Sequence, residues 1–251
     1  MNENTKLAQV LASSLDLTLP PIAISFCDTP PAHAPSYDGV APAGCAFWQQ
    51  AAARTFATTA KDHALCSIGV YTHHLADAPA SHQSELAEAL KVMGELDYVR
   101  PEEVAAIPVM ARRAKYVVYG PLAECQTAAD VVLIFAHAAQ SLIVSEAVAR
   151  VDRGAPPAMG RPACAAVPQA FNRQTAALSL GCCGARAYLD VLTDNVALWA
   201  LPGAKLDQYC AEIAAFARAN KTLAEFHSRR RNDVEAGQQP TVRQSLERLS
   251  S

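Results

Sequence analysis

The sequence lacks every short motif that would assign it to a common enzyme class. It contains no GxGxxG or Walker loop for nucleotide phosphates, no GxSxG nucleophile turn, no HExxH zinc motif and no CxxC pair. These absences argue against a standard dinucleotide enzyme, a nucleotide hydrolase, a serine hydrolase, a zincin and a thioredoxin.

Long apolar runs and strong net charge are also absent. No segment approaches the ~20 apolar residues that are needed to span a bilayer. Residues 1–21 lack the charged start and unbroken apolar middle of a signal peptide. The net charge is −3, so no basic excess indicates nucleic-acid binding. We therefore expect a cytoplasmic protein that binds neither membranes nor nucleic acid.

Apolar residues are abundant, at 51% of the 251-residue chain, which is enough for a sizeable core. Their periodicity predicts an α/β (or α+β) fold, with residues 1–225 as one globular domain and 226–251 as a polar C-terminal tail. The expected strands are 22–26, 55–58, 116–119, 131–135, 177–180 and 196–200, and the clearest helices are 4–15, 82–99, 138–151 and 204–226.

Two halves of the chain, about 16–125 and 126–225, follow the same order of features. Each has a strand, a proline-rich loop, a cysteine with a helix, another strand and a second cysteine. The cysteines are Cys45 and Cys66 in the first half, and Cys164 and Cys182 in the second. This order predicts an internal duplication, with two similar halves around a central cleft where the four cysteines meet. The alternative is a chance similarity of order within an α/β chain.

The eight cysteines are expected to be reduced in a cytoplasmic protein, which favours metal binding, redox chemistry or burial over disulfides. Cys45, Cys66, Cys164 and Cys182 each lie at a predicted strand–helix or loop–helix junction, where helix N-termini stabilise thiolates. The first two and Cys182 are the ones grouped as cluster ligands. We predict that these three hold a 4Fe–4S cluster, with Cys164 as the fourth ligand or an open fourth iron. Zinc is the alternative metal, although the dispersed spacing departs from that of structural zinc sites.

The predicted function is therefore that of an iron–sulfur protein, either a lyase or an oxidoreductase, which performs redox or Lewis-acid chemistry on a small substrate. His63 would transfer protons and Arg186 would hold a small anionic substrate. Four cysteine ligands would instead favour electron transfer to a redox partner protein. The alternatives are a non-enzymatic zinc or small-molecule binding module, and an enzyme whose nucleophile is Cys66 or Cys182, activated by His63. The apolar composition is compatible with a homodimer.

Three stretches of the chain resemble a known family. They are PPIAISF, GCAFWQQAAARTFATTAKDHALCSIGVYTHHL and GRPACAAVPQAFNRQTAALSLGCCGARAYLDV. Their order and spacing, over roughly residues 8–220, are similar to the uncharacterised family called domain of unknown function 169. The resemblance implies a bacterial or archaeal cytoplasmic protein in which Cys45, Cys66 and Cys182 belong to the family pattern. Cys164 fits that pattern less closely, and Cys183 is particular to this sequence. The family name implies no activity.

Overall fold

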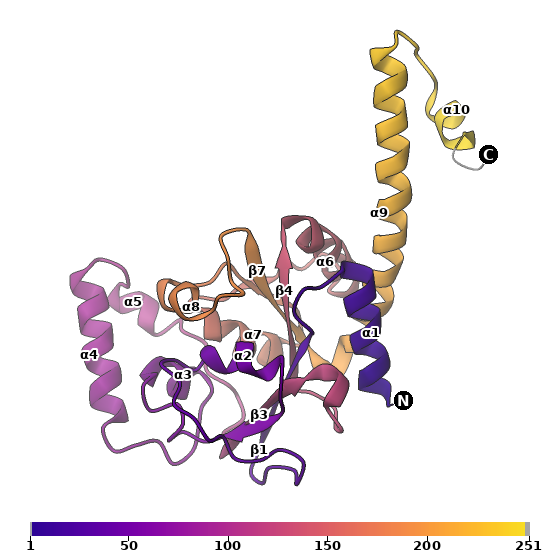
Figure 1. Cartoon of the computed structure of the whole chain (residues 1–251). Coiled ribbons are helices and arrows are strands. Elements are labelled where there is room, and N and C mark those ends of the chain that lie inside the picture. The colour runs from indigo at the N-terminus through magenta and orange to yellow at the C-terminus, as the bar shows by residue number, and fades with distance from the viewer. Residues whose placement is uncertain (1, 249–251) are drawn as a thin grey trace.

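The computed structural model describes residues 2–248, in which one mixed sheet of seven strands is covered by helices on both faces (Figure 1). The strand order is β2-β3-β1-β4-β7-β6-β5, and every neighbouring pair is antiparallel except β5 and β6. This confirms the predicted mixture of helices and strands. The strands are β1 (Ile22–Cys27), β2 (Phe56–Thr58), β3 (Tyr116–Pro121), β4 (Val131–His137), β5 (Ala158–Met159), β6 (Ala177–Ser179) and β7 (Val196–Pro202).

The centre of the sheet is the antiparallel pair of β1 and β4, which runs from Ile22 opposite Leu133 to Ile24 opposite Val131. The first six residues of β4 are all buried, because helices pack on both sides of this strand. A continuous apolar run is typical of such a strand. The helices are therefore divided between two layers, each with its own apolar core.

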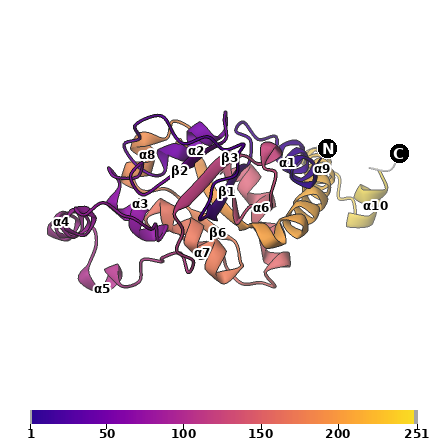
Figure 2. The same cartoon turned by 90° about the horizontal axis from the view of Figure 1, so that it is seen from below.

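One layer carries the short helices that follow the proline-rich loops: α2 (Ala46–Ala51), α3 (Ser67–Thr72), α7 (Ala166–Arg173) and α8 (Cys183–Tyr188). The opposite layer consists of α1 (Glu3–Leu15), α6 (Ala138–Val151) and α9 (Leu206–Glu235). The two layers can be followed in Figure 2. The remaining helical segments are α4 (His82–Glu95), α5 (Pro101–Val104), α10 (Val242–Glu247), and the 3-10 turns η1 (Leu122–Glu124), η2 (Ala163–Ala165) and η3 (Gly203–Lys205).

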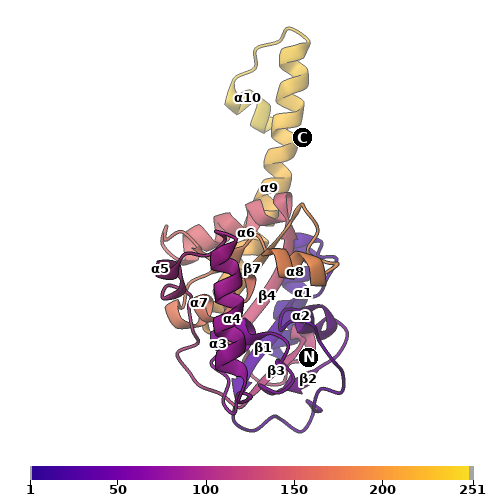
Figure 3. The same ribbon diagram turned by 90° about the vertical axis from the view of Figure 1, so that its left-hand side faces the viewer.

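Helix α9 is longer than the sequence indicated and projects beyond the body of the protein (Figures 1 and 3). Its first turns pack on the core, and further along Phe226 is buried near α10. The predicted tail, 226–251, thus forms the end of α9 and then α10, whereas residues 249–251 lie outside the described residues, as does residue 1 of the predicted globular domain. Among the helices described, none is both long and apolar enough to cross a membrane.

A buried carboxylate joins the second layer to the sheet. Asp152 accepts hydrogen bonds from the Tyr209 hydroxyl at 2.7 Å and from the Ala176 N–H at 2.9 Å, and Lys205 lies 3.5 Å away. Burial and the neighbouring Asp152 raise the pKa of Tyr209, so this hydroxyl keeps its proton. The carboxylate therefore stabilises α9 against the end of α6.

Replacing Asp152 with alanine is expected to lower the free energy of unfolding by about 3 kcal/mol, because two buried donors lose their acceptor. Urea unfolding followed by circular dichroism measures this. Asp194→Ala, at an exposed position, is the matched control and should change stability by less than about 0.5 kcal/mol. Equal stability of the two variants would contradict the role given to Asp152.

Candidate functional site

A pocket of about 460 Å³ lies beside the first layer of helices, bordered by α3, α8, η2 and the segment that contains α4 and α5. Five cysteines line it, namely Cys45, Cys66, Cys164, Cys182 and Cys183. The other walls are largely apolar, with Leu90 and Met93 from α4 and Ile107 beyond α5. The pocket thus brings together all four cysteines that the sequence analysis grouped.

Cys66 and Cys182 occupy equivalent positions at the starts of short helices. Cys66 is the N-cap residue of α3, and Cys182 is the N-cap residue of α8. The Ala185 N–H donates to Cys182 Sγ at 3.4 Å, so this thiol serves as a cap. Gly181 has a φ of +90°, a conformation that favours glycine and turns the chain sharply into the helix.

The thiols differ in accessibility. Cys45 and Cys164 are buried, Cys66 and Cys182 are partly exposed, and Cys183 is exposed. Burial raises the pKa of Cys45 to about 12, with a smaller contribution from the neighbouring Cys66 and Cys182. Burial also raises the pKa of Cys164, whose sulfur accepts a hydrogen bond from Thr72 at 3.4 Å. Both buried thiols therefore remain protonated at neutral pH, and reactive chemistry falls to the partly exposed pair.

The prediction of an iron–sulfur protein is wrong. Across residues 2–248, no group of three or more His, Cys, Asp or Glu side chains is arranged so that it could hold a metal ion. The four cysteines share a pocket, but they come from four separate segments and do not form a common ligand set. The zinc alternative fails for the same reason, since zinc requires ligand atoms at ~2.0–2.3 Å from one point.

His63 lies directly behind Cys66. Its side chain is buried, with a relative exposure of 1%, and burial together with His73 lowers its pKa well below the ordinary value. A Cβ placed on Gly69 would lie 3.0 Å from Cys66 Sγ and 3.7 Å from His63 Nδ1. The sulfur and the nitrogen therefore flank the same point beside Gly69, although no hydrogen bond joins them within the described residues.

The hydrogen bonds of His63 determine which nitrogen is free. Nε2 lies 3.1 Å from Thr58 Oγ1, and that hydroxyl donates its only hydrogen to the Val117 carbonyl at 3.2 Å. The tautomer that satisfies both contacts is the one in which the hydroxyl accepts from Nε2–H. Nδ1 then carries a lone pair, and it has no hydrogen-bond partner among the described atoms. In this tautomer the neutral imidazole carries a free acceptor nitrogen between Gly44 and Gly69.

Further polar groups are buried around His63. Its ring makes an edge contact with that of His73 at 5.9 Å between centroids, and neither nitrogen of His73 has a partner within residues 2–248. Burial lowers the pKa of His73 to about 4. The Tyr119 hydroxyl, also buried, has no partner in the same part of the chain. These buried side chains around His63 are therefore uncharged at neutral pH.

Arg186 does not line the pocket wall. Its guanidinium donates to the carbonyls of Leu180, Leu192 and Thr193, the last at 2.8 Å, and thereby connects the two sides of the loop around Cys182. The structure thus places this arginine as a support for the Cys182 segment.

The sequence analysis missed the charged pair at the pocket. Arg161 binds Glu103 at 3.1 Å and lies 5.2 Å from the centre of the Tyr98 ring. All three residues line the pocket. Residues 82–99 were predicted to be helical, but no local pattern indicated that α4 faces the cysteines, because that depends on how α4 packs beside α3.

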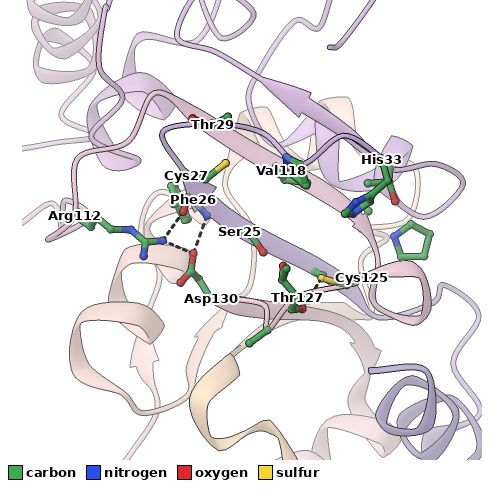
Figure 4. Close-up of a pocket in the computed structure, with 16 residues that line it drawn as sticks. Ser25, Phe26, Cys27, Thr29, His33, Arg112, Val118, Cys125, Thr127 and Asp130 are labelled. Atoms are coloured by element: carbon green, nitrogen blue, oxygen red, sulfur yellow. Dashed lines mark hydrogen bonds and ion pairs between the residues drawn. The ribbon is translucent and has the colours of Figure 1, made fainter. Parts of the chain in front are cut away.

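A second pocket, of about 320 Å³, lies along the outer face of β1 (Figure 4). At one end Asp130 accepts from the Phe26 N–H at 2.7 Å and from Arg112, which also donates to the Phe26 carbonyl. Elsewhere in this pocket the Cys125 thiol donates to Thr127 at 3.0 Å. These polar groups bind one another, so the cysteine-lined pocket is the better candidate site.

The protein therefore has a mixed α/β fold, with an apolar pocket lined by thiols at the starts of two short helices. The chain belongs to the family named domain of unknown function 169, described as an uncharacterised ArCR, whose family model matches residues 10–212. All five pocket cysteines lie within that range, whereas most of α9 and all of α10 lie beyond it. No curated protein and no solved structure matches the chain.

Proposed function

We propose that this protein binds a small, largely apolar organic molecule in the cysteine-lined pocket, and that Cys66 attacks it as a nucleophile. The observation that carries the proposal is that the unpartnered Nδ1 of buried His63 and the sulfur of Cys66 flank the same point beside Gly69. A cysteine nucleophile requires a group that accepts its proton, and a neutral imidazole within reach is the usual one.

Three features support Cys66 as the nucleophile and His63 as the group that accepts its proton. Burial lowers the pKa of His63, so the ring is unprotonated at neutral pH. Thr58 fixes the tautomer and the ring orientation, as the third member of a nucleophile–base–orienting arrangement does. At Cys182 the Ala185 N–H donates to the sulfur, which stabilises a thiolate but does not supply a base.

The reactivity of the individual thiols tests the proposal. With limiting iodoacetamide and quantification of each cysteine peptide by mass spectrometry, Cys66 is expected to react about tenfold faster than Cys183, although Cys183 is more exposed. Cys66→Ser should abolish the fast phase, whereas Cys182→Ser, the matched control, should retain it. Modification that simply follows exposure, with Cys183 first, would overturn the proposal.

We also propose that the two halves of the chain repeat one unit. In support, β1 pairs with β3 and β3 with β2, while β4 pairs with β7 and β7 with β6 in the same sequence order. The 3-10 turns η1 and η3 follow β3 and β7 directly. Cys66 and Cys182 cap corresponding short helices, which supports a pocket formed between the two halves.

The cytoplasmic location and the small-molecule partner are proposals too. All eight cysteines are unpaired, which supports a reducing compartment. A ligand with one anionic group would have to compete with Glu103 for Arg161, so the charge of the ligand is secondary to its apolar part. A homodimer remains a prediction.

A further inference from the structure

The wall of the pocket opposite the thiols is an amphipathic helix with no buried residue. Helix α4 packs beside α3, yet none of its 14 residues is buried. Ala89, Leu90 and Met93 form one face of α4 and line the pocket. Apolar side chains that border a space of this size, rather than a packed core, are typical of ligand sites. The space therefore accommodates an apolar chain between α4 and the cysteines.

The pocket has two polar features. The Cys66 sulfur and His63 Nδ1 flank Gly69 on α3, whereas the Arg161–Glu103 ion pair is half exposed and connects η2 with α5. Glu103 already neutralises the charge of Arg161 within 3.1 Å. A ligand that fits both walls is one whose apolar chain ends in an uncharged electrophilic carbon beside the sulfur.

We propose that the substrate is a thioester with an apolar acyl chain, and that its acyl group is transferred to Cys66. This inference rests on the proposed function, because it requires Cys66 to be the nucleophile. An acyl thioester has an uncharged carbonyl carbon at the end of an apolar chain, as the two walls require. The carboxylate of a free fatty acid would have no unpaired cation to bind at the described thiol end of the pocket.

The transfer balances without an oxidant or a reductant. Cys66 Sγ forms a bond to the carbonyl carbon while its proton passes to His63 Nδ1. The bond from that carbon to the sulfur of the departing thiol then breaks, and the departing thiolate takes the proton back from His63. One thioester replaces another, and His63 returns to its neutral form, which burial favours.

The test uses the full-length protein and octanoyl N-acetylcysteamine, a small-molecule thioester. Intact mass spectrometry is expected to show one added octanoyl group, and peptide mapping should locate it on Cys66. The acetyl thioester of the same thiol should react about tenfold more slowly, because it lacks the chain that α4 would bury. Cys66→Ser should give no adduct.

Two substitutions on α4 compare the effect of a residue that lines the pocket with that of an exposed residue on the same helix. Met93→Asp should slow octanoyl transfer about tenfold more than it slows acetyl transfer, because only the longer chain reaches this wall. Val92→Asp is the matched control, since Val92 is exposed and does not line the pocket, and it should change neither rate.

The outcomes distinguish the two proposals. Rapid alkylation of Cys66 by iodoacetamide without octanoyl transfer would overturn the acyl substrate and leave the nucleophile in place. Octanoyl transfer that is independent of chain length, or unaffected by Met93→Asp, would overturn the chain-binding wall. Slow reaction of Cys66 with both reagents would overturn the proposed function itself.

Discussion

Replacing His63 with glutamine is expected to slow the alkylation of Cys66 about 100-fold at neutral pH. The imidazole Nδ1 has no hydrogen-bond partner among the described atoms and flanks the same point beside Gly69 as that sulfur. Glutamine is close to histidine in size and retains an amide that can donate to Thr58, but it cannot accept a proton at neutral pH. The rate is measured from the Cys66 peptide at several times after addition of limiting iodoacetamide.

The Cys183 peptide provides an internal control in the same samples. Cys183 is exposed and His63 is buried behind Cys66, so the Cys183 rate should be the same in both proteins. His33→Gln is the matched histidine substitution, because His33 lines the second pocket and should leave the Cys66 rate unchanged. An unchanged melting temperature of the His63→Gln variant would show that the slower reaction comes from loss of the base and not from loss of structure. If His63→Gln leaves Cys66 as reactive as before, His63 is not its base.

The protein is expected to lose stability in mild acid because two histidines are buried in neutral form. Burial lowers the folded-state pKa of His73 to about 4 from the ordinary value of 6.5, and it also lowers that of His63 well below the ordinary value. As the pH falls below 6.5, the unfolded chain takes up protons at these positions, whereas the folded protein does not. Protonation therefore lowers the free energy of the unfolded state. The free energy of unfolding decreases as the pH falls from 6.5 to about 4.

The size of this effect follows from the pKa difference. His73 alone accounts for a loss of about 2 kcal/mol between neutral pH and about pH 5, and of about 3 kcal/mol once the pH is below its folded-state pKa. Urea unfolding at the two pH values measures the loss. His73→Phe keeps a ring of similar shape without a titrating nitrogen, and it should show a pH dependence smaller by about 2 kcal/mol. Identical pH dependence in both proteins would contradict a neutral, buried His73.

Much of the fold could be predicted because it follows from local patterns. The apolar run of β4 indicated a strand buried on both faces, and the structure has it at Val131–His137. The length of α9 could not be predicted in the same way. Its second half is polar and carries ion pairs one turn apart, Arg229 with Glu225 and Arg231 with Glu235, and each pair contributes only a few tenths of a kcal/mol. The packing of α10 near Phe226 is a long-range contact that hydrophobic periodicity does not encode.

The site was only half predictable. Grouping Cys45, Cys66, Cys164 and Cys182 was correct to the extent that all four line one pocket. The conclusion drawn from that grouping was wrong, because metal binding depends on distances between sulfur atoms. Four segments that reach the same pocket can still leave their thiols too far apart to share an ion. Residue order places chain segments, whereas ligand geometry requires positions within a few tenths of an ångström.

By itself, the sequence determined the alternation of helices and strands, the family, and which thiols accompany the short helices. Each of these depends on residues that are near one another in the chain. Only the tertiary structure brought the His63 ring to Thr58 of β2, whose hydroxyl contacts the Val117 carbonyl of β3, and placed His63 Nδ1 and the Cys66 sulfur around Gly69. Only the tertiary structure placed α4 across from the thiols. Both arrangements arise from packing between segments that are distant in the sequence, and this packing determines which chemical groups meet at the pocket.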